Sequence, residues 1–176
     1  MKNLLLHACC APCMTVPIER LQPEYDITGF FYNPNIHPEE EYKKRLDEIT
    51  NWTQQTGIPL IVHEYDVDHW HELVKGLEKE PERGKRCTVC FRMRLQQTAI
   101  LAKQKGFDCF TTTLSISPHK NANIINKIGK ELGDQIGVQF LEANFKKKNG
   151  FKRSIELSKK YNFYRQDYCG CIYSRR

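Results

Sequence analysis

The chain has 176 residues, of which 27 are basic and 21 acidic, and its formal net charge is +6. This length suits one domain that buries a hydrophobic core of its own, so structural disulfides are not needed for folding. No apolar stretch approaches the roughly 20 residues of a membrane span, and the run Leu4-Leu5-Leu6 is too short for a secretory signal, so we expect a soluble, cytoplasmic protein.

Short apolar runs alternate with helical patterns along the first half of the chain. The first run leads into a turn that contains Pro12, and the second stops at Asn33-Pro34-Asn35. Pro38 followed by acidic residues favours a helix start, and Gly57 favours its end. The expected elements are a strand over 3–8, a helix near 15–21, a strand over 27–32, a helix from about 38 to 56, a strand over 58–65 and a helix near 69–79.

The second half continues this alternation. A breaker region at 81–84 precedes a helical pattern whose first turn carries Cys87 and Cys90. The positive end of a helix favours thiolates at that place. The expected elements are a helix over 86–105, a strand over 107–114, a helix over 123–133, a strand over 138–143 and a helix over 153–161.

This order of elements predicts an α/β fold with a mostly parallel, five-stranded sheet and helices on both faces. We expect residues 1–176 to form a single domain that ends in a basic, cysteine-bearing segment from about 145 to 176. Ligands bind at the carboxyl ends of parallel strands. That rule brings together the residues that follow four of the strands, which are Cys9, Cys10, Asn33, His37, Asp66, Ser115 and His119.

Three groups of cysteines carry the chemistry, because cytoplasmic thiols stay reduced and serve as ligands or redox groups. The groups are Cys9-Cys10-x-x-Cys13, Cys87-x-x-Cys90 and Cys169-Gly170-Cys171. Two Cys-x-x-Cys pairs are typical of a structural zinc site. Adjacent cysteines are unusual for zinc, whereas a cluster of several iron atoms can accept both. Iron-sulfur, zinc and metal-free thiol chemistry all stay open on these residues alone.

The tail pair differs from the other groups because a single glycine separates its cysteines. A disulfide between Cys169 and Cys171 would close a small, strained ring, and strain makes such a bond easier to reduce. This favours a redox couple, with metal ligation as the alternative. Cys109 stands apart on an expected strand and is predicted to be a small buried hydrophobic residue.

The turn after the first strand reads His7-Ala8-Cys9-Cys10-Ala11-Pro12-Cys13. A turn that binds ATP phosphates needs glycines and exposed backbone N–H groups. Here there is no glycine, and Pro12 removes one donor. We therefore expect no ATP at this turn, although the fold class would permit it.

The C-terminal segment is strongly basic, with ten basic and two acidic residues from 146 to 176. Aromatic residues lie among these charges, and phosphate attraction combined with stacking is how proteins hold single-stranded nucleic acid. The alternative is a solvated helix whose aromatic residues enter the core. The candidate nucleic-acid-binding residues are Lys146, Lys147, Lys148, Lys152, Arg153 and Arg165.

Five motifs, in this order, resemble the cobalamin-independent epoxyqueuosine reductase family over nearly the whole chain. They are the first turn at 7–13, Tyr32-Asn33-Pro34-Asn35-Ile36-His37-Pro38, Arg86-Cys87-x-x-Cys90, Thr111-Thr112-Thr113-Leu114 with Ser117-Pro118, and Tyr164-Arg165-Gln166-x-Tyr168-Cys169-Gly170-Cys171. The resemblance implies a Rossmann-like fold and the reduction of epoxyqueuosine to queuosine at the wobble position of tRNA. It also implies an electron donor, which the sequence does not identify, and no need for cobalamin.

The resemblance further implies a cofactor and residue roles. Cys9, Cys10, Cys87 and Cys90 would hold a [4Fe-4S] cluster, and Cys169 and Cys171 would form a redox-active pair. Cys13 falls outside this ligand set and is kept as a candidate ligand of a second metal ion, iron being one choice. Losing the epoxide oxygen as water takes two electrons and two protons. Asp66, His37 and His119 are therefore candidate proton donors, with cap, turn or surface roles as the alternative.

Two other functions would fit the same chain. An ATP-dependent tRNA-modifying enzyme, such as a thiolase, could use this fold class and would require ATP. A zinc-stabilised RNA-binding module would be colourless and would carry zinc.

Overall fold

The structure, a computed structural model, describes residues 1–175. Arg176, which is counted above among the basic residues, lies outside the described residues.

A five-stranded sheet forms the centre of the fold. Its strands are β1 (Lys2–His7), β2 (Tyr25–Phe31), β3 (Leu60–Val62), β4 (Cys109–Thr112) and β5 (Gln139–Phe140). In space they follow the order β3-β2-β1-β4-β5, and every neighbouring pair is parallel. The predicted α/β fold with a five-stranded parallel sheet is confirmed.

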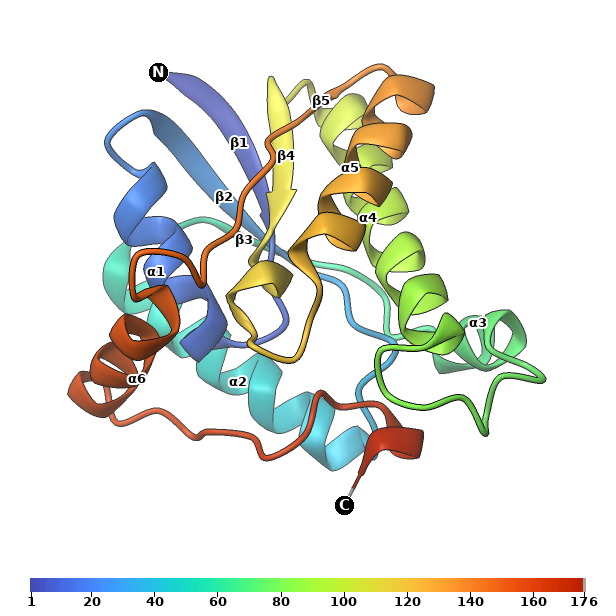
Figure 1. The fold of residues 1–176 in the computed structure, drawn as a ribbon. Coiled ribbons are helices and arrows are strands. Elements are labelled where there is room, and N and C mark those ends of the chain that lie inside the picture. Colours follow the sequence, from blue (N-terminus) through green and yellow to red (C-terminus); the bar gives the residue numbers. More distant parts are fainter. Residues whose placement is uncertain (176) are drawn as a thin grey trace.

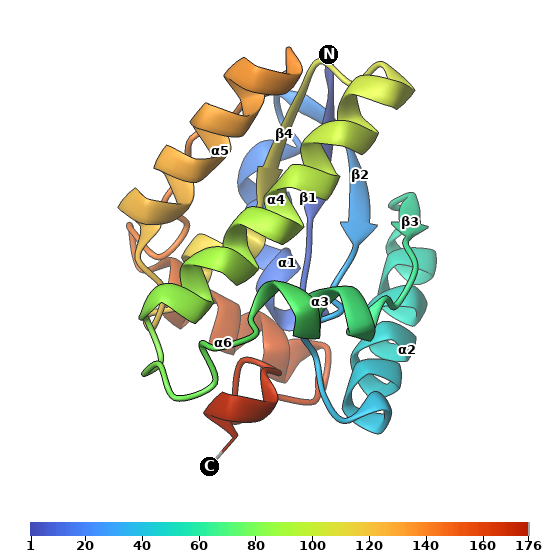
Figure 2. The same ribbon diagram turned by 90° about the vertical axis from the view of Figure 1, so that its right-hand side faces the viewer.

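Helices cover both faces of this sheet (Figures 1 and 2). They are α1 (Ala11–Leu21), α2 (Glu39–Thr56), α3 (Val67–Leu73), α4 (Lys85–Lys105), α5 (Ala122–Ile136) and α6 (Gly150–Lys160). α4 and α5 pack on one face, while α1 and α2 pack on the other and α6 lies against α1. Among residues 1–175, no helix is both long and apolar enough to span a bilayer.

Side chains of the central strand β1 enter the hydrophobic core on both faces of the sheet. Successive side chains of a strand point to opposite faces of a sheet. Leu5 accordingly packs with residues of α4 and α5, whereas Leu4 and Leu6 pack with residues of α1 and α2. All three leucines are fully buried. The apolar run at the start of the chain thus reflects a strand covered on both sides, as a central parallel strand must be.

Helix α1 begins at Ala11, four residues before the predicted start. Cys10 is its N-cap, and the Cys10 sulfur accepts a hydrogen bond from the backbone N–H of Cys13 at 3.3 Å. Pro12 is tolerated because the first turn of a helix leaves its N–H groups unpaired. Cys10 and Cys13 are therefore the N-cap and a first-turn residue of α1, so this Cys-x-x-Cys segment is not a loop.

The edge strands are shorter than predicted. β3 and β5 are three and two residues long and lie at the two ends of the strand order. Each pairs on one side only, so fewer hydrogen bonds maintain its extended shape. β4 also ends early, because the Thr112 hydroxyl accepts the Leu114 N–H at 3.2 Å and begins the 3-10 helix η1 (Thr113–Ile116).

The C-terminal segment runs from α6 across the carboxyl ends of the central strands (Figure 1). It ends in a short 3-10 helix, η2 (Ile172–Ser174), close to the amino end of α2. We call residues 161–175 the tail. The tail brings Cys169 and Cys171 to the same edge of the sheet as the turn that follows β1.

Candidate functional site

Three sulfur atoms gather in the turn between β1 and α1. Those of Cys9, Cys10 and Cys13 all lie within 4.8 Å of one another. The Cys9 and Cys10 sulfurs are 3.8 Å apart, and the Gln166 side chain of the tail donates to the Cys10 sulfur at 3.2 Å. Within residues 1–175, this is the one group of three or more candidate ligand atoms with such close spacing.

The electrostatics of these three thiols differ. Hydrogen bonds from Cys10 and Cys13 hold the pKa of Cys9 well below its usual range. Burial raises the pKa of Cys10 to about 12, and the pKa of Cys13 rises because its thiol proton is held in hydrogen bonds to Cys10 and Cys9. A single shared negative charge is therefore what the metal-free trio favours, because two thiolates at this distance would repel each other.

His7 supports this turn from inside the sheet. Its ring is fully buried, with Nδ1 3.0 Å from the Thr112 hydroxyl and Nε2 3.0 Å from the Tyr32 carbonyl oxygen. Burial lowers the pKa of His7 to about 4, so the ring is neutral near pH 7 and connects β1 with β4 and the end of β2. Asn33 adds a bond from its side-chain amide to the Ala8 carbonyl at 3.0 Å. The backbone in front of Cys9 is thereby held rigidly.

Cys87 and Cys90 lie at the start of α4. Cys90 is buried, Cys87 is half-buried, and the Cys87 sulfur accepts the Arg83 N–H at 3.3 Å. We expected the helix end to favour thiolates, but burial raises the pKa of both residues. Desolvation in an apolar wall outweighs the helix dipole here. A thiolate at either position therefore needs a nearby cation.

Cys169 and Cys171 complete the site from the tail. All eight cysteines are free thiols, and the Cys169 sulfur is 2.9 Å from the Ser174 hydroxyl oxygen. Gly170 has a φ of +114° and lies so close to Ile36 that a Cβ would approach Ile36 Cγ1 to 2.8 Å. Only glycine fits between the two cysteines, for both reasons.

Helix α2 holds the tail in place. Arg45 is almost completely buried and donates to the carbonyl oxygens of Cys169 and Tyr168, both at 3.0 Å. Its Nε pairs with Glu41 at 2.9 Å. Glu48, one turn further along the same face, accepts the Tyr164 N–H at 2.8 Å. Three charged residues of one helix face thus anchor the tail.

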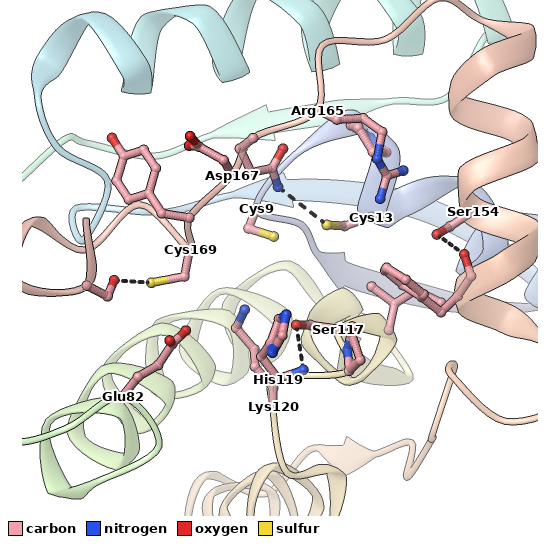
Figure 3. Close-up of a pocket in the computed structure, with 17 residues that line it drawn as sticks. Cys9, Cys13, Glu82, Ser117, His119, Lys120, Ser154, Arg165, Asp167 and Cys169 are labelled. Carbon is pink, nitrogen blue, oxygen red and sulfur yellow. Dashed lines mark hydrogen bonds between the residues drawn. The ribbon is translucent and has the colours of Figure 1, made fainter. Parts of the chain in front are cut away.

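Two adjoining hollows lie between the tail and the rest of the site. The larger has a volume of about 210 Å³ and is lined by Cys9, Cys13 and Cys169, with His119 and Lys120 on the opposite wall (Figure 3). The smaller is lined by Cys87, Cys90, Cys169 and Cys171. The hollows share Glu82, Cys169, His119 and Lys120. Cys169 therefore lies between the two cysteine groups as a shared wall of both hollows.

Seven cysteines pack in or against one buried cluster at this edge. Cys87 and Cys90 are outside the close trio of sulfurs, whereas Cys13, which the resemblance left out of the ligand set, belongs to it. Cys109 packs in a different part of the core and is 2% exposed. Its prediction as a small buried hydrophobic residue is confirmed.

The three candidate proton donors occupy different places. Asp66 caps α3, its carboxylate accepting the His69 N–H at 3.1 Å. His37 is buried against the tail; Nε2 is 3.0 Å from the Pro34 carbonyl oxygen, and Nδ1 is 3.4 Å from the Ile172 nitrogen, which donates to it. Burial lowers the pKa of His37 to about 4. His119 alone of the three lines both hollows.

The candidate nucleic-acid-binding residues also occupy different places. The Lys146 ammonium donates to the Ser115 and Lys120 carbonyl oxygens, both at 3.0 Å. Arg153 pairs with Glu19 at 2.9 Å on the surface. Arg165 lines the larger hollow and donates to Ser158 at 2.9 Å. Lys147, Lys148 and Lys152 are exposed.

Comparison with known proteins identifies the family. A family model described as epoxyqueuosine reductase QueH matches residues 4–176. The chain belongs to this family. An epoxyqueuosine reductase QueH of Histophilus somni is 45% identical over 99% of this chain and 72% of its own length. The relatives from Acinetobacter baylyi and Thermotoga maritima are 44% and 37% identical, over 99% of this chain and over 81% and 91% of their own lengths.

Membership in the QueH family makes this chain an oxidoreductase that reduces epoxyqueuosine in tRNA, as the sequence motifs predicted. Solved structures with 11% identity share only its fold. One is a predicted tRNA methyltransferase subunit from Methanocaldococcus jannaschii, with a TM-score of 0.62 over 90% of this chain and 75% of that one. The other is the U34-tRNA thiolase NcsA from Methanococcus maripaludis with its [4Fe-4S] cluster, with a TM-score of 0.62 over 99% and 62%.

Sequence reasoning missed the buried arginines of this QueH site. Arg45 and Arg94 are 1% and 3% exposed, yet both occur in helical patterns that are rich in charge. An arginine in such a pattern is usually on the surface. Gln166 lay within a recognised motif, and that motif was the only signal for its contact with Cys10.

Arg45→Met should loosen the tail. Two carbonyls of the tail and the Glu41 carboxylate would lose their partner, so we expect the free energy of unfolding to fall by about 3–5 kcal/mol. Alkylation of Cys169 by iodoacetamide in metal-free protein should become at least about tenfold faster, which corresponds to ~1.4 kcal/mol of lost protection. Urea unfolding and peptide mass spectrometry measure the two effects.

Arg92→Met is the matched control, because Arg92 pairs with Glu131 on the surface, where both side chains are about 40% exposed. We expect this variant to lose less than about 1 kcal/mol and to leave Cys169 protected. Equal alkylation rates in the two variants would show that Arg45 does not anchor the tail.

Proposed function

We propose that this enzyme reduces epoxyqueuosine at the wobble position of tRNA with a [4Fe-4S] cluster held by Cys9, Cys10, Cys87 and Cys90. One observation carries the proposal above all others. Seven cysteines from three distant parts of the chain converge on one buried cluster at the carboxyl edge of a parallel sheet. That edge is where α/β proteins bind their ligands.

The residues present fit such a cofactor. Thiolates are the ligands that iron-sulfur clusters take. Burial raises the pKa of Cys10, Cys87 and Cys90, so these thiols would stay protonated without a cation to hold them as thiolates. Trp70 adds a buried indole N–H that lies close enough to Cys90 to lower the pKa of its thiol by hydrogen bonding, and it lines the same hollow as Cys90. It is available as a donor to sulfur.

Cys13 then has a role of its own. Its sulfur lies within 4.8 Å of Cys9 and Cys10 and it lines the larger hollow. We propose Cys13 as a ligand of a second metal ion, iron, at the wall where substrate would enter. A structural zinc site would use the same thiols. Metal analysis therefore decides between the two kinds of site.

Cys169 and Cys171 in the tail would supply the two electrons that the reaction needs. A bound [4Fe-4S] cluster supplies single electrons, while removing the epoxide oxygen as water requires two electrons and two protons. Oxidation of Cys169 and Cys171 to a disulfide releases two electrons and two protons, which balances the conversion of the epoxide to an alkene. An external electron donor would then reduce the disulfide again.

The larger hollow is our proposed place for the modified nucleoside. Cys169 lines this hollow, as do Cys9, His119 and Lys120 (Figure 3). His119 is exposed and lines both hollows, so we propose it as a proton donor. We propose positioning roles for His37, which contacts the tail, and for Asp66, which caps α3.

We infer that the anticodon loop binds across the tail and the loop before α6. A single-stranded loop lets a base leave its stack without opening a duplex. Lys147 and Lys148 are exposed in that loop, Lys152 is exposed in the first turn of α6, and Arg165 extends the charge into the larger hollow. Phosphates of the loop would contact these side chains while the base enters between Cys9 and Cys169.

The proposed reaction can be tested directly. The protein, reconstituted under anaerobic conditions and given a strong reductant, should convert epoxyqueuosine in an anticodon stem-loop to queuosine without ATP or cobalamin. Nucleoside mass spectrometry of the digested RNA measures the product. Persistence of the epoxide with an intact cluster and a competent donor would contradict the proposed chemistry. A requirement for ATP would point to the nucleotide-dependent alternative.

Ligand test. Single serine variants of Cys9, Cys10, Cys87 and Cys90 should lose bound iron and the visible absorption of anaerobically purified protein, because each removes a thiolate ligand. Cys169→Ser and Cys171→Ser should keep the iron and lose turnover. Cys109→Ala is the control, since Cys109 packs elsewhere in the core.

Iron and sulfide analysis of these variants gives two decisive outcomes. Full iron content in all four ligand variants would refute the assignment. Zinc in place of iron in the natural chain would favour a structural site instead.

RNA test. Lys147→Gln combined with Lys148→Gln should weaken tRNA binding and flatten its dependence on salt. Each lost phosphate contact removes about 0.7–0.9 from the slope of log K against log salt, so the pair should remove about 1.4–1.8. Lys2→Gln with Lys105→Gln is the control, because both are exposed at the opposite edge of the sheet. Equal slopes for the two double variants would show that Lys147 and Lys148 are ordinary solvated surface residues that do not contact RNA phosphates.

A further inference from the structure

Arg94 is a buried cation that has no carboxylate partner among residues 1–175. Its side chain is 3% exposed and lies in the middle of α4. Its Nε donates to the Cys90 carbonyl oxygen at 3.3 Å, and the guanidinium carbon lies 5.8 Å from the centre of the Phe91 ring. Among the ion pairs within residues 1–175, none includes Arg94. Such a charge is costly to bury unless an anion accompanies it.

Other arginines of the chain have visible compensation. Arg45 is equally buried and pairs with Glu41 at 2.9 Å, while Arg92 pairs with Glu131 at the surface. Arg86 is buried too, but its Nη1 donates to three carbonyl oxygens of the loop before α4, at Leu77, Glu78 and Glu80. Arg94 has one such carbonyl, at the edge of hydrogen-bond distance. The anion that would neutralise Arg94 therefore belongs in the hollow that Arg94 lines.

The spacing along α4 directs Arg94 at the cysteines. Cys87, Cys90 and Arg94 follow one another at intervals of three and four residues, which places them on one face of the helix. All three line the smaller hollow together with Cys169 and Cys171.

We propose that Arg94 is the buried counter-charge of the anionic sulfur at this site and that it raises the reduction potential of the group the cysteines hold. The inference rests on the proposed iron-sulfur function. Four thiolates around a [4Fe-4S] core carry a net negative charge, and reduction adds one more. A fixed cation nearby stabilises the more negative state, so it favours reduction.

Arg94→Met tests this role, because methionine keeps an apolar stem of similar length and removes the charge. The loaded variant should keep the iron and sulfide content of the natural chain. Its equilibrium constant for one-electron reduction should fall at least about tenfold, which is a shift of about 59 mV toward more negative potential. Potentiometric titration, followed by electron paramagnetic resonance of the reduced protein, measures the shift. Arg94→Lys should recover more than half of it, and Arg92→Met should leave the potential unchanged.

The metal-free protein provides an independent readout. Without the cluster, only the single charge shared by the Cys9, Cys10 and Cys13 thiols remains to compensate Arg94, and those thiols can take up a proton once Arg94 is removed, so metal-free Arg94→Met should unfold at a urea concentration no lower than the natural metal-free chain. A lower midpoint would make Arg94 an ordinary structural residue and overturn the proposal. An unchanged potential in a fully loaded variant would overturn it as well. If the natural chain did not bind iron and sulfide, this result would instead contradict the proposed iron-sulfur function on which the inference rests.

Discussion

The parallel pairing of β1 with β2 on one side and β4 on the other constrains everything else in the site. His7, the last residue of β1, is aligned with Phe30 and with Thr112, so the strands end at nearly the same level. The buried His7 ring then bonds to the Thr112 hydroxyl oxygen and the Tyr32 carbonyl oxygen. This neutral, enclosed ring therefore fixes the level at which the turn that carries Cys9 and Cys10 leaves the sheet.

Charge compensation is the second constraint, and two buried arginines meet it differently. Arg45 carries its own anion, Glu41, and directs its remaining donors at the tail, which makes it a mechanical anchor. Arg94 pairs with no carboxylate in the described part of the chain and lines the hollow that holds Cys87, Cys90, Cys169 and Cys171. A buried cation next to thiols whose burial raises their pKa is a mismatch in the metal-free chain that a polyanionic cofactor would remove. The same mismatch would then become a means of setting the potential.

The sheet and helices alone do not select this chemistry. A thiolase with a [4Fe-4S] cluster and a predicted tRNA methyltransferase subunit share the architecture at 11% identity. What distinguishes this chain lies in the loops at one edge: a first turn with cysteines and a proline, a cysteine pair at the start of α4, and a tail that crosses in front of both. A fold offers the edge, and the residues on it decide the reaction.

The sequence by itself determined the alternation of strands and helices, and hence the parallel sheet, because strand and helix periods are local properties of neighbouring residues. It also determined the family, because five motifs occur in order. Only the tertiary structure decided that Cys13 joins Cys9 and Cys10, that His37 contacts the tail, and that Lys146 bonds to the carbonyls of another loop. Those facts depend on contacts between residues far apart in the chain. Burial of Arg45 and Arg94 belongs to the same class, since exposure is decided by what packs against a helix and not by the helix's own sequence.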